Sequence, residues 1–428
     1  MEKGHITSTY PFNAFSVTLN KRGVSDYTKT SYPIRYGNYS EIKTKNLVYH
    51  FNLNGEIRFI QGRGDDWPNP VEWVKRTMGN DWVYYSSGGY NGVFDCLGEY
   101  YVPCLSYGAS SLLDARPFNL PEVTKAIDGW AGAVSSLASS LNGNRDAALI
   151  DFFETVTKKD PSFLVGRARR FYEMIGGPIS VLPPDTRHVD YDVIPVTIAD
   201  GCLYNCGFCS VKSGKRFSAR TEENILSQIH QLKAFLGPDL RNYNSVFLGQ
   251  HDALNAADEL IFFTARQAYD HLTLDRSYMT GATLFLFGSV GSFLSKKASF
   301  FEEMNRLPYK TYINIGVESA DPATLKYLRK PISLEDIERT FERMMAVNHR
   351  FEAIEITLNF VIGENLPENH APSILSLIRD RLDRPYPKGA IYISPLHEYE
   401  KKRYMKDALH VIKTQSRLPV YYYLIQRL

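Results

Sequence analysis

From Tyr191 onward, apolar segments of strand length alternate with segments of helical periodicity. Nearly continuous apolar strands that alternate with helices form parallel sheets buried on both faces. This pattern predicts an α/β fold, a partial (βα)6 TIM-like barrel with its chemistry on the loops at the carboxyl ends of the strands. We expect strands at Val193–Ala199, Ser245–Gly249, Ala282–Phe287, Thr311–Gly316, Ile354–Ile362 and Ala390–Ser394, helices at Thr221–Phe235, Ala256–Leu272, Leu334–Ala346 and Pro367–Leu382, and a last strand at Val420–Ile425.

A cluster of cysteines directly follows the first expected strand. Cys202, Cys206 and Cys209 form the motif C-x-x-x-C-x-x-C. Three thiolates this close on one loop can bind one soft metal centre, and an iron–sulfur cluster held by three cysteines keeps one iron open to another ligand. The alternatives are a structural zinc site, a disulfide framework or chance. A structural zinc site needs four protein ligands, and the sequence has no fourth Cys or His at a fitting offset. Three cysteines on one loop cannot all pair in disulfides.

The cysteine spacing, with Phe208 directly before Cys209, resembles the signature of radical S-adenosylmethionine (SAM) enzymes. The resemblance implies a [4Fe-4S] cluster held by Cys202, Cys206 and Cys209. Its open iron would chelate the amino and carboxylate groups of SAM, and Phe208 would contact the cofactors. It also implies that one electron cleaves SAM to a 5′-deoxyadenosyl radical, which abstracts hydrogen from a substrate.

Two loops after later strands carry polar residues where this family binds SAM. After the second strand, Gly249-Gln-His-Asp stands in place of the family's Gly-Gly-Glu, so the resemblance implies that Asp252 accepts the SAM ammonium and that His251 faces the substrate. The alternative is a polar loop in which Asp252 caps the next helix. The stretch from Gly316 to Lys330 is similar to the elongator-type and oxygen-independent coproporphyrinogen-oxidase-like branches of the superfamily.

By that similarity, Glu318 contacts the ribose or amino group of SAM, and Arg329 or Lys330 supplies a cation for its carboxylate. A salt-bridging helix end is the alternative for this basic pair. Asn359, on the fifth strand, stands where relatives have an Asp or Asn near the ribose. His397, just beyond the sixth strand, is a titratable group that can transfer protons at the mouth of the site.

Residues 1–185 are predicted to form an α+β domain that caps the barrel and selects the substrate, and residues 186–428 the radical SAM core with a C-terminal tail. In the N-terminal part, an Asn54-Gly55 turn between two alternating segments predicts a hairpin. Many aromatic residues precede residue 120, and they form either core or a binding surface. Cys96 and Cys104 are interpreted as buried free thiols, with a contribution to the active site as the alternative.

Composition describes an ordinary globular protein, with 44% hydrophobic and 22% charged residues and a formal charge of +2. This charge gives no reason to expect a nucleic acid partner, and no apolar run has the length of a membrane helix. We expect a cytoplasmic enzyme that acts on a small or medium organic substrate. A basic stretch from Lys212 to Arg220 compensates the charge of the cluster, attracts a flavodoxin or ferredoxin reductant, or is simply a solvated loop.

The sequence leaves two other functions open. The first is a non-catalytic SAM-binding or iron–sulfur sensor or scaffold, because the Gln-His-Asp loop departs from the family motif. The second is radical modification of a protein or RNA partner, which we expect only if the aromatic N-terminal residues form an exposed groove.

Overall fold

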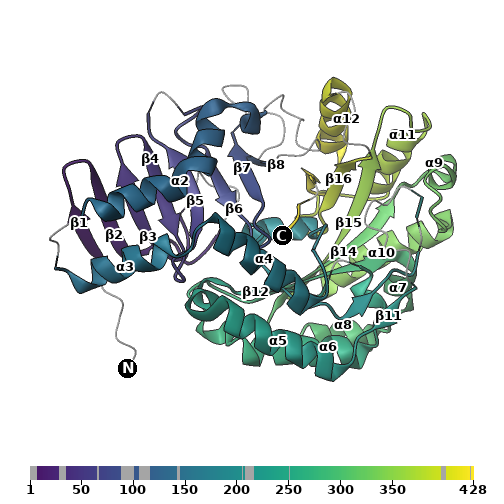
Figure 1. Cartoon of the computed structure of the whole chain (residues 1–428). Coiled ribbons are helices and arrows are strands. Elements are labelled where there is room, and N and C mark those ends of the chain that lie inside the picture. The colour runs from purple at the N-terminus through teal and green to yellow at the C-terminus, as the bar shows by residue number, and fades with distance from the viewer. Residues whose placement is uncertain are drawn as a thin grey trace.

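The structure is a computed structural model of the chain that describes residues 7–27, 35–64, 67–87, 101–105, 116–141, 145–204, 206–207, 216–249, 251–396, 402–424 and 426–428. It contains two main sheets, an antiparallel sheet in the N-terminal part and a parallel sheet in the C-terminal part, which lie side by side (Figure 1). Within the described ranges, no helix combines the length and apolar character needed to cross a bilayer.

The N-terminal sheet has its eight described strands in sequence order, each antiparallel to the next. They are β1 (Ser8–Pro11), β2 (Phe15–Arg22), β3 (Asn38–Thr44), β4 (Leu47–Phe51), β5 (Ile57–Gly62), β6 (Trp73–Arg76), β7 (Trp82–Ser86) and β8 (Val102–Leu105). The predicted hairpin is confirmed, because β4 and β5 pair around the Asn54-Gly55 turn. Gly55 has a φ of +76°, which glycine adopts without strain.

Three helices cover one face of this sheet: α2 (Pro121–Ser139), α3 (Ala147–Thr157) and α4 (Pro161–Ile175) (Figure 1). Buried side chains on α2, among them Val123, Trp130 and Val134, share a core with Val17, Ile42 and Tyr84 of the sheet. Asp160 caps α4 by accepting a hydrogen bond from the backbone N–H of Phe163, with Pro161 as the first helical residue.

The aromatic residues of the N-terminal part mainly build core. Trp67, Trp73, Tyr84 and Tyr85 are each 5% exposed or less. The carboxylate of Glu72 is also buried, and it accepts hydrogen bonds from the Tyr84 hydroxyl and from the backbone and side chain of Ser87. This burial favours core over a binding surface.

The C-terminal sheet has the order β17-β16-β15-β14-β13-β12-β9 and is parallel throughout. Its strands are β9 (Ile194–Pro195), β12 (Ser245–Phe247), β13 (Thr283–Ser289), β14 (Lys310–Glu318), β15 (Ile354–Ile362), β16 (Ile391–Pro395) and β17 (Val420–Tyr422). The predicted α/β class with a parallel sheet is confirmed, and so is the last strand at its edge. We call the two ends of this sheet its amino end and its carboxyl end, after the direction of the strands.

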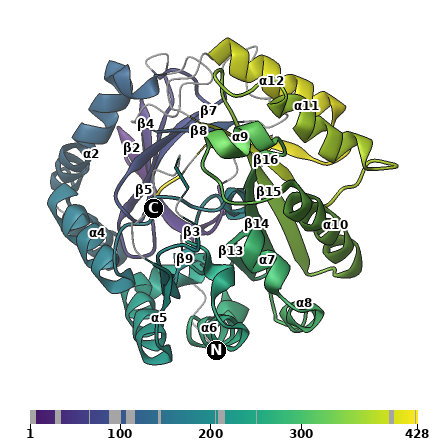
Figure 2. The same ribbon diagram turned by 90° about the vertical axis from the view of Figure 1, so that its right-hand side faces the viewer.

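The helices of this part lie mostly around the outside of the parallel sheet (Figure 2). They are α5 (Glu222–Leu236), α6 (Asp258–His271), α7 (Val290–Ser295), α8 (Ala298–Met304), α9 (Pro322–Tyr327), α10 (Leu334–Arg350), α11 (His370–Leu375) and α12 (Lys402–Gln415). The helix predicted at Pro367–Leu382 is shorter than expected, because α11 passes into a π-helical turn at Ser376–Asp380.

The first strand is also shorter than predicted. Ile194 and Pro195 pair with β12, and a separate short strand, β10 (Ala199–Asp200), pairs with β11 (Ser218–Ala219). Between them, the side-chain amide of Gln228 on α5 binds both the N–H and the C=O of Thr197, at 3.0 Å each. A helix side chain thus takes the backbone groups that a strand partner would have used.

The N-terminal sheet contacts the amino end of the parallel sheet. Asn242, which precedes β12, binds the backbone of Asn38 through both its amide oxygen and its amide nitrogen. Lys75 on β6 forms buried ion pairs with Asp190 and Asp192, which lie in the connector that leads into β9. These contacts do not test the predicted division at residue 185 or the substrate-selecting role of the N-terminal part, and both stay predictions.

Candidate SAM and iron–sulfur site

The cysteine loop starts at the carboxyl end of the parallel sheet, directly after β10. Cys202 forms an isolated bridge with Arg216, and Arg220 holds the carboxylate of Asp200 through two hydrogen bonds of 2.9 Å. Arg220 also donates to the backbone C=O of Ile175 at the end of α4. Arg216 and Arg220, at the described end of the basic stretch, therefore hold the start of the cysteine loop in place.

Two of the three predicted cluster ligands, Cys202 and Cys206, are described, and Cys209 and Phe208 lie outside the described residues, as do Lys212 and Lys215. Among the side chains that the structure describes, no group of three His, Cys, Asp or Glu residues is arranged to hold a metal ion. The three-cysteine cluster site therefore stays a prediction.

His251 lies against the cysteine loop. Its Nδ1 is 3.3 Å from the sulfur of Cys202. Burial lowers the pKa of His251, with Asp200 acting in the opposite direction. The structure thus brings this predicted catalytic residue next to a predicted cluster ligand, whereas His397 lies outside the described ranges.

Asp252 is 6% exposed and does not cap the helical turn that follows it. Its Oδ1 instead accepts hydrogen bonds from the backbone N–H of Ser289 (3.0 Å) and the hydroxyl of Ser292 (2.7 Å), at the start of α7. The helix-cap alternative is therefore wrong. The other oxygen, Oδ2, is buried and has no hydrogen-bond partner in the described part of the chain.

Glu318, at the end of β14, is held from two sides. It accepts hydrogen bonds from the ammonium of Lys330 (3.3 Å) and the side-chain amide of Asn359 (3.2 Å), and that amide also reaches Ser394 at 3.4 Å. A Cβ atom on Gly316 would lie 2.7 Å from Oε1 of Glu318, so the absence of a side chain there leaves room for the carboxylate.

Two residues with an unfavourable backbone conformation lie at the same place. Glu318 has a φ of +70° and Arg329 one of +52°, a conformation that is unfavourable for residues with a Cβ. The β14–β15 register also shifts between Gly316 and Glu318. Non-glycine residues held in this region are common at ligand sites, where the surrounding structure over-determines them.

The loop around Arg329 contacts the cysteine loop. The backbone N–H of Gly207 donates to the C=O of Leu328 at 3.1 Å, and a Cβ on Gly207 would lie 2.9 Å from the side chain of Arg329. Arg329 is thus next to the cysteine loop, while Lys330 is paired with Glu318. The salt-bridge alternative therefore describes Lys330 and not Arg329, and the roles of both residues toward SAM stay predictions.

Tyr204, which lies between two cysteines of the motif, is not among the residues predicted from the sequence. Its hydroxyl accepts a hydrogen bond from the backbone N–H of Gly291 at 3.1 Å. Burial raises the pKa of Tyr204. The negative charge of Asp252 also raises this pKa, while the positive charge of Lys330 lowers it. Its place inside the motif is the one signal in the sequence that marks it.

The polar oxygens at this end fit the groups that SAM presents. An ammonium and a ribose diol require buried acceptors, and Oδ2 of Asp252 and Oδ1 of Asn359 are both buried without a partner among the described residues. Glu318 adds a third acceptor. Arg329, beside the cysteine loop, supplies positive charge.

Comparison with known proteins decides the class of this site. Residues 196–378 match the sequence profile of the radical SAM superfamily. The chain carries a radical SAM domain. The match covers all the described site residues from Cys202 to Asn359 and concerns the superfamily as a whole, so it gives no support to the elongator-type or coproporphyrinogen-oxidase-like branch.

The protein with this radical SAM domain is an enzyme, and its cofactors are the [4Fe-4S] cluster and SAM that members of the superfamily use. A non-catalytic sensor or scaffold is not favoured. The chain is similar at 11% identity to a crystal structure of SuiB from Streptococcus suis, with a TM-score of 0.34, over 82% of this chain and 70% of that one. No curated protein matches the chain.

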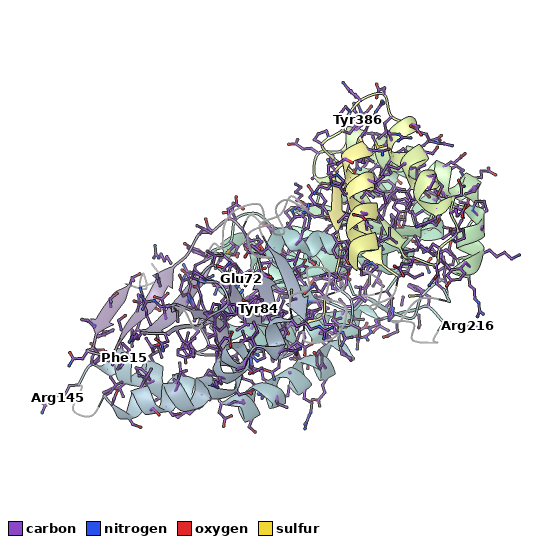
Figure 3. All side chains as sticks on the ribbon, turned by 90° about the horizontal axis from the view of Figure 1, so that it is seen from above. Phe15, Glu72, Tyr84, Arg145, Arg216 and Tyr386 are labelled. Atoms are coloured by element: carbon purple, nitrogen blue, oxygen red, sulfur yellow. The ribbon has the colours of Figure 1, made fainter. Side chains whose placement is uncertain are left out.

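The remaining described cysteine lies outside the site. Cys104 on β8 is fully buried, and burial raises the pKa of its thiol to about 12, with a smaller contribution from Glu72. Glu72 and Tyr84 are well separated from Arg216, which marks the base of the cysteine loop (Figure 3). Cys104 is therefore a buried thiol, as predicted, and Cys96 lies outside the described ranges.

Proposed function

We propose that the enzyme holds its [4Fe-4S] cluster with Cys202, Cys206 and Cys209 and abstracts hydrogen from a small or medium organic substrate. When bound and reduced by one electron, the cluster and SAM supply the 5′-deoxyadenosyl radical. The observation that carries the proposal is the pair of buried oxygens without a partner among the described residues, on Asp252 and Asn359, in the same domain end as the cysteine loop.

The residues of this chain bind and orient SAM in the proposal. Asp252 accepts the SAM ammonium with Oδ2, since Oδ1 is occupied by Ser289 and Ser292. Glu318 and Asn359 accept the ribose hydroxyls. Arg329 pairs with the SAM carboxylate, because Lys330 already neutralises Glu318. Phe208 completes the cofactor contacts from the cysteine loop.

The wider arrangement in this proposal is a partial (βα)6 barrel formed by the parallel sheet, with substrate and SAM at its carboxyl end. Residues 1–185 act as the substrate-selecting domain, and His251 and His397 serve proton transfer. A flavodoxin or ferredoxin supplies the electron. A cytoplasmic location suits this chemistry, because that compartment keeps thiols reduced.

The test is anaerobic reconstitution with iron and sulfide, followed by dithionite reduction in the presence of SAM. We expect the wild-type protein to bind iron and sulfide in a [4Fe-4S] ratio and to form 5′-deoxyadenosine. The variants Cys202→Ala and Cys206→Ala should lose the cluster and the product. Cys104→Ala is the matched control, since its thiol is buried in the N-terminal sheet, and it should keep both. Zinc in the purified protein, or a cluster that persists in Cys202→Ala, contradicts the proposal.

A further inference from the structure

Glu318 needs support from outside its own strand, because its left-handed backbone is unfavourable for a residue with a side chain. Lys330 and Asn359 bind its carboxylate, but a side-chain contact does not by itself fix the backbone. The next residue, Ser319, is fully buried, and its hydroxyl lies only two bonds from its own Cα, so contacts of this short side chain restrain the backbone more closely than contacts of the long Glu318 side chain.

Ser319 is joined to His370, the first residue of α11, by a hydrogen bond of 2.8 Å between its hydroxyl and Nδ1. The other ring nitrogen, Nε2, is 2.7 Å from the backbone oxygen of Val361. A carbonyl only accepts, so Nε2 carries the proton and Nδ1 of the neutral ring accepts from Ser319. Burial lowers the pKa of His370, which favours this neutral form.

A second link ties the same turn to α11. The hydroxyl of Ser319 accepts from the backbone N–H of Asp321 at 3.0 Å, and Asp321 caps α9 through Thr324. Oδ1 of Asp321 accepts from the side-chain amide of Asn369, the residue before His370, at 3.3 Å. Asn369 and His370, at the start of α11, thus hold the segment between Glu318 and α9 through two side-chain hydrogen bonds.

The Ser319–His370 pair is not a nucleophile and base. Ser319 is 0% exposed and His370 is 3% exposed. The second ring nitrogen faces a backbone carbonyl and not a carboxylate, so the pair lacks the acidic third member of a hydrolytic triad. Its geometry serves to hold the turn.

We propose that His370 is a positioning residue that holds Glu318 in its left-handed conformation through Ser319, and so sets the affinity for SAM. The inference rests on the proposed role of Glu318 as a SAM contact. Since Glu318 binds SAM before any chemistry occurs, loss of the pair raises the dissociation constant and KM for SAM more than it lowers kcat.

The experiment compares His370→Leu, His370→Asn and Ser319→Ala with the wild type, each reconstituted anaerobically. The measurements are iron content, the dissociation constant for SAM by equilibrium dialysis, and the rate of 5′-deoxyadenosine formation against SAM concentration. We expect His370→Leu and Ser319→Ala to weaken SAM binding about tenfold, the equivalent of one buried hydrogen bond, with kcat within about twofold. His370→Asn offers its side-chain oxygen to Ser319 and should restore most of the affinity.

His50→Leu is the control, because His50 is an equally buried histidine on β4 of the N-terminal sheet. It should leave SAM affinity unchanged. Wild-type affinity in His370→Leu, or equal loss in His370→Asn and His370→Leu, overturns the inference alone. If His370→Leu does not fold, Ser319→Ala decides, since it removes only the hydroxyl. A wild-type protein that binds no SAM overturns the proposed function together with this inference.

Discussion

The amino end and the carboxyl end of the parallel sheet both carry buried ionisable side chains and left-handed residues, but they pair these side chains differently. At the amino end, Lys75 lies 3.0 Å from Asp190 and 2.8 Å from Asp192, and Asp192 also pairs with Arg58. At the carboxyl end, Asp252 keeps a buried oxygen without a partner among the described residues.

Strain does not distinguish the two ends. Asp190 and Tyr191 have positive φ values, as do Glu318 and Arg329. Paired charges indicate an interface that is complete within the protein, while an unpaired buried acceptor indicates a place where a ligand supplies the donor. The hydroxyl of Thr311, at the amino end of β14, is also buried without a hydrogen-bond partner among the described residues, so the contrast concerns charged groups alone. The pairing of buried carboxylates is the feature that distinguishes the two ends.

The largest expected effect is on stability, at the amino end. Lys75→Met removes a buried cation and leaves Asp190 without its charged partner, which we expect to lower the free energy of unfolding by about 3–5 kcal/mol. Burial opposes the charged form of Asp192, but Arg58 and Lys75 outweigh it and lower the pKa of this carboxyl. Urea denaturation measures the effect.

Arg350→Met is the control for this variant. Arg350 pairs with Glu302 on the surface, with side chains 60% and 39% exposed, and surface pairs contribute little to stability. Folded Lys75→Met should keep wild-type affinity for SAM. Weaker SAM binding in this variant would mean that the two ends are not separate in function.

The next largest effect is on the pH dependence of stability, and it concerns Asp185 in the 3-10 turn Pro184–Val189. The carboxylate of Asp185 accepts hydrogen bonds from Tyr392 (2.7 Å) and Thr357 (2.8 Å), which lie between the two ends of the sheet. Burial raises its pKa to about 7, and the hydrogen bonds from Tyr392 and Thr357 oppose this shift. The folded protein therefore holds a proton that the unfolded chain has released between about pH 4 and pH 7.

Since the folded state binds more protons in that range, stability from Asp185 decreases as pH rises and levels off above pH 7. We expect the wild type to lose about 3 kcal/mol relative to Asp185→Asn between pH 5 and pH 8. Urea denaturation of both proteins across this range measures the difference. Parallel pH profiles would show that Asp185 is ionised in the folded protein.

Sequence patterns predicted the parts of the fold that depend on local order. Apolar strands located β12 to β16, and Asn54-Gly55 located the hairpin. Because parallel strands end together, the same patterns predicted that Asp252, Glu318 and Asn359 would lie at one end of the sheet. Their roles toward SAM stay predictions.

Other features depend on residues far apart in the chain. Asp252 binds Ser289, and Gln228 ends the first strand by binding Thr197, contacts that no local pattern encodes. The left-handed conformation of Glu318 is equally absent from the sequence, since nothing in Gly-Val-Glu-Ser marks a positive φ. Tertiary contacts set these features, and they carry most of the detail of the site.

At the carboxyl end, Asp252→Asn should weaken SAM binding without loss of stability. The new amide keeps an oxygen for Ser289 and Ser292 but replaces the buried acceptor with a donor that repels the ammonium. A hydrogen bond to a charged group contributes about 1.5–3 kcal/mol, so we expect a loss of about 10- to 100-fold in affinity, measured by equilibrium dialysis. Asp258→Asn, on α6 and paired with Lys296, is the control that should bind SAM normally.

The smallest effect compares one hydroxyl at each end. Tyr204→Phe removes the acceptor for the Gly291 N–H and loosens the cysteine loop from α7 by about 1 kcal/mol, so the cluster should be lost to a chelator about fivefold faster. Tyr36→Phe removes a hydroxyl 2.7 Å from Asp192 at the amino end and should lower the unfolding midpoint while the cluster is lost at the wild-type rate. If instead both variants lose the cluster at the same rate, the Tyr204 contact does not hold the loop, and the difference between the two ends does not extend to single hydrogen bonds.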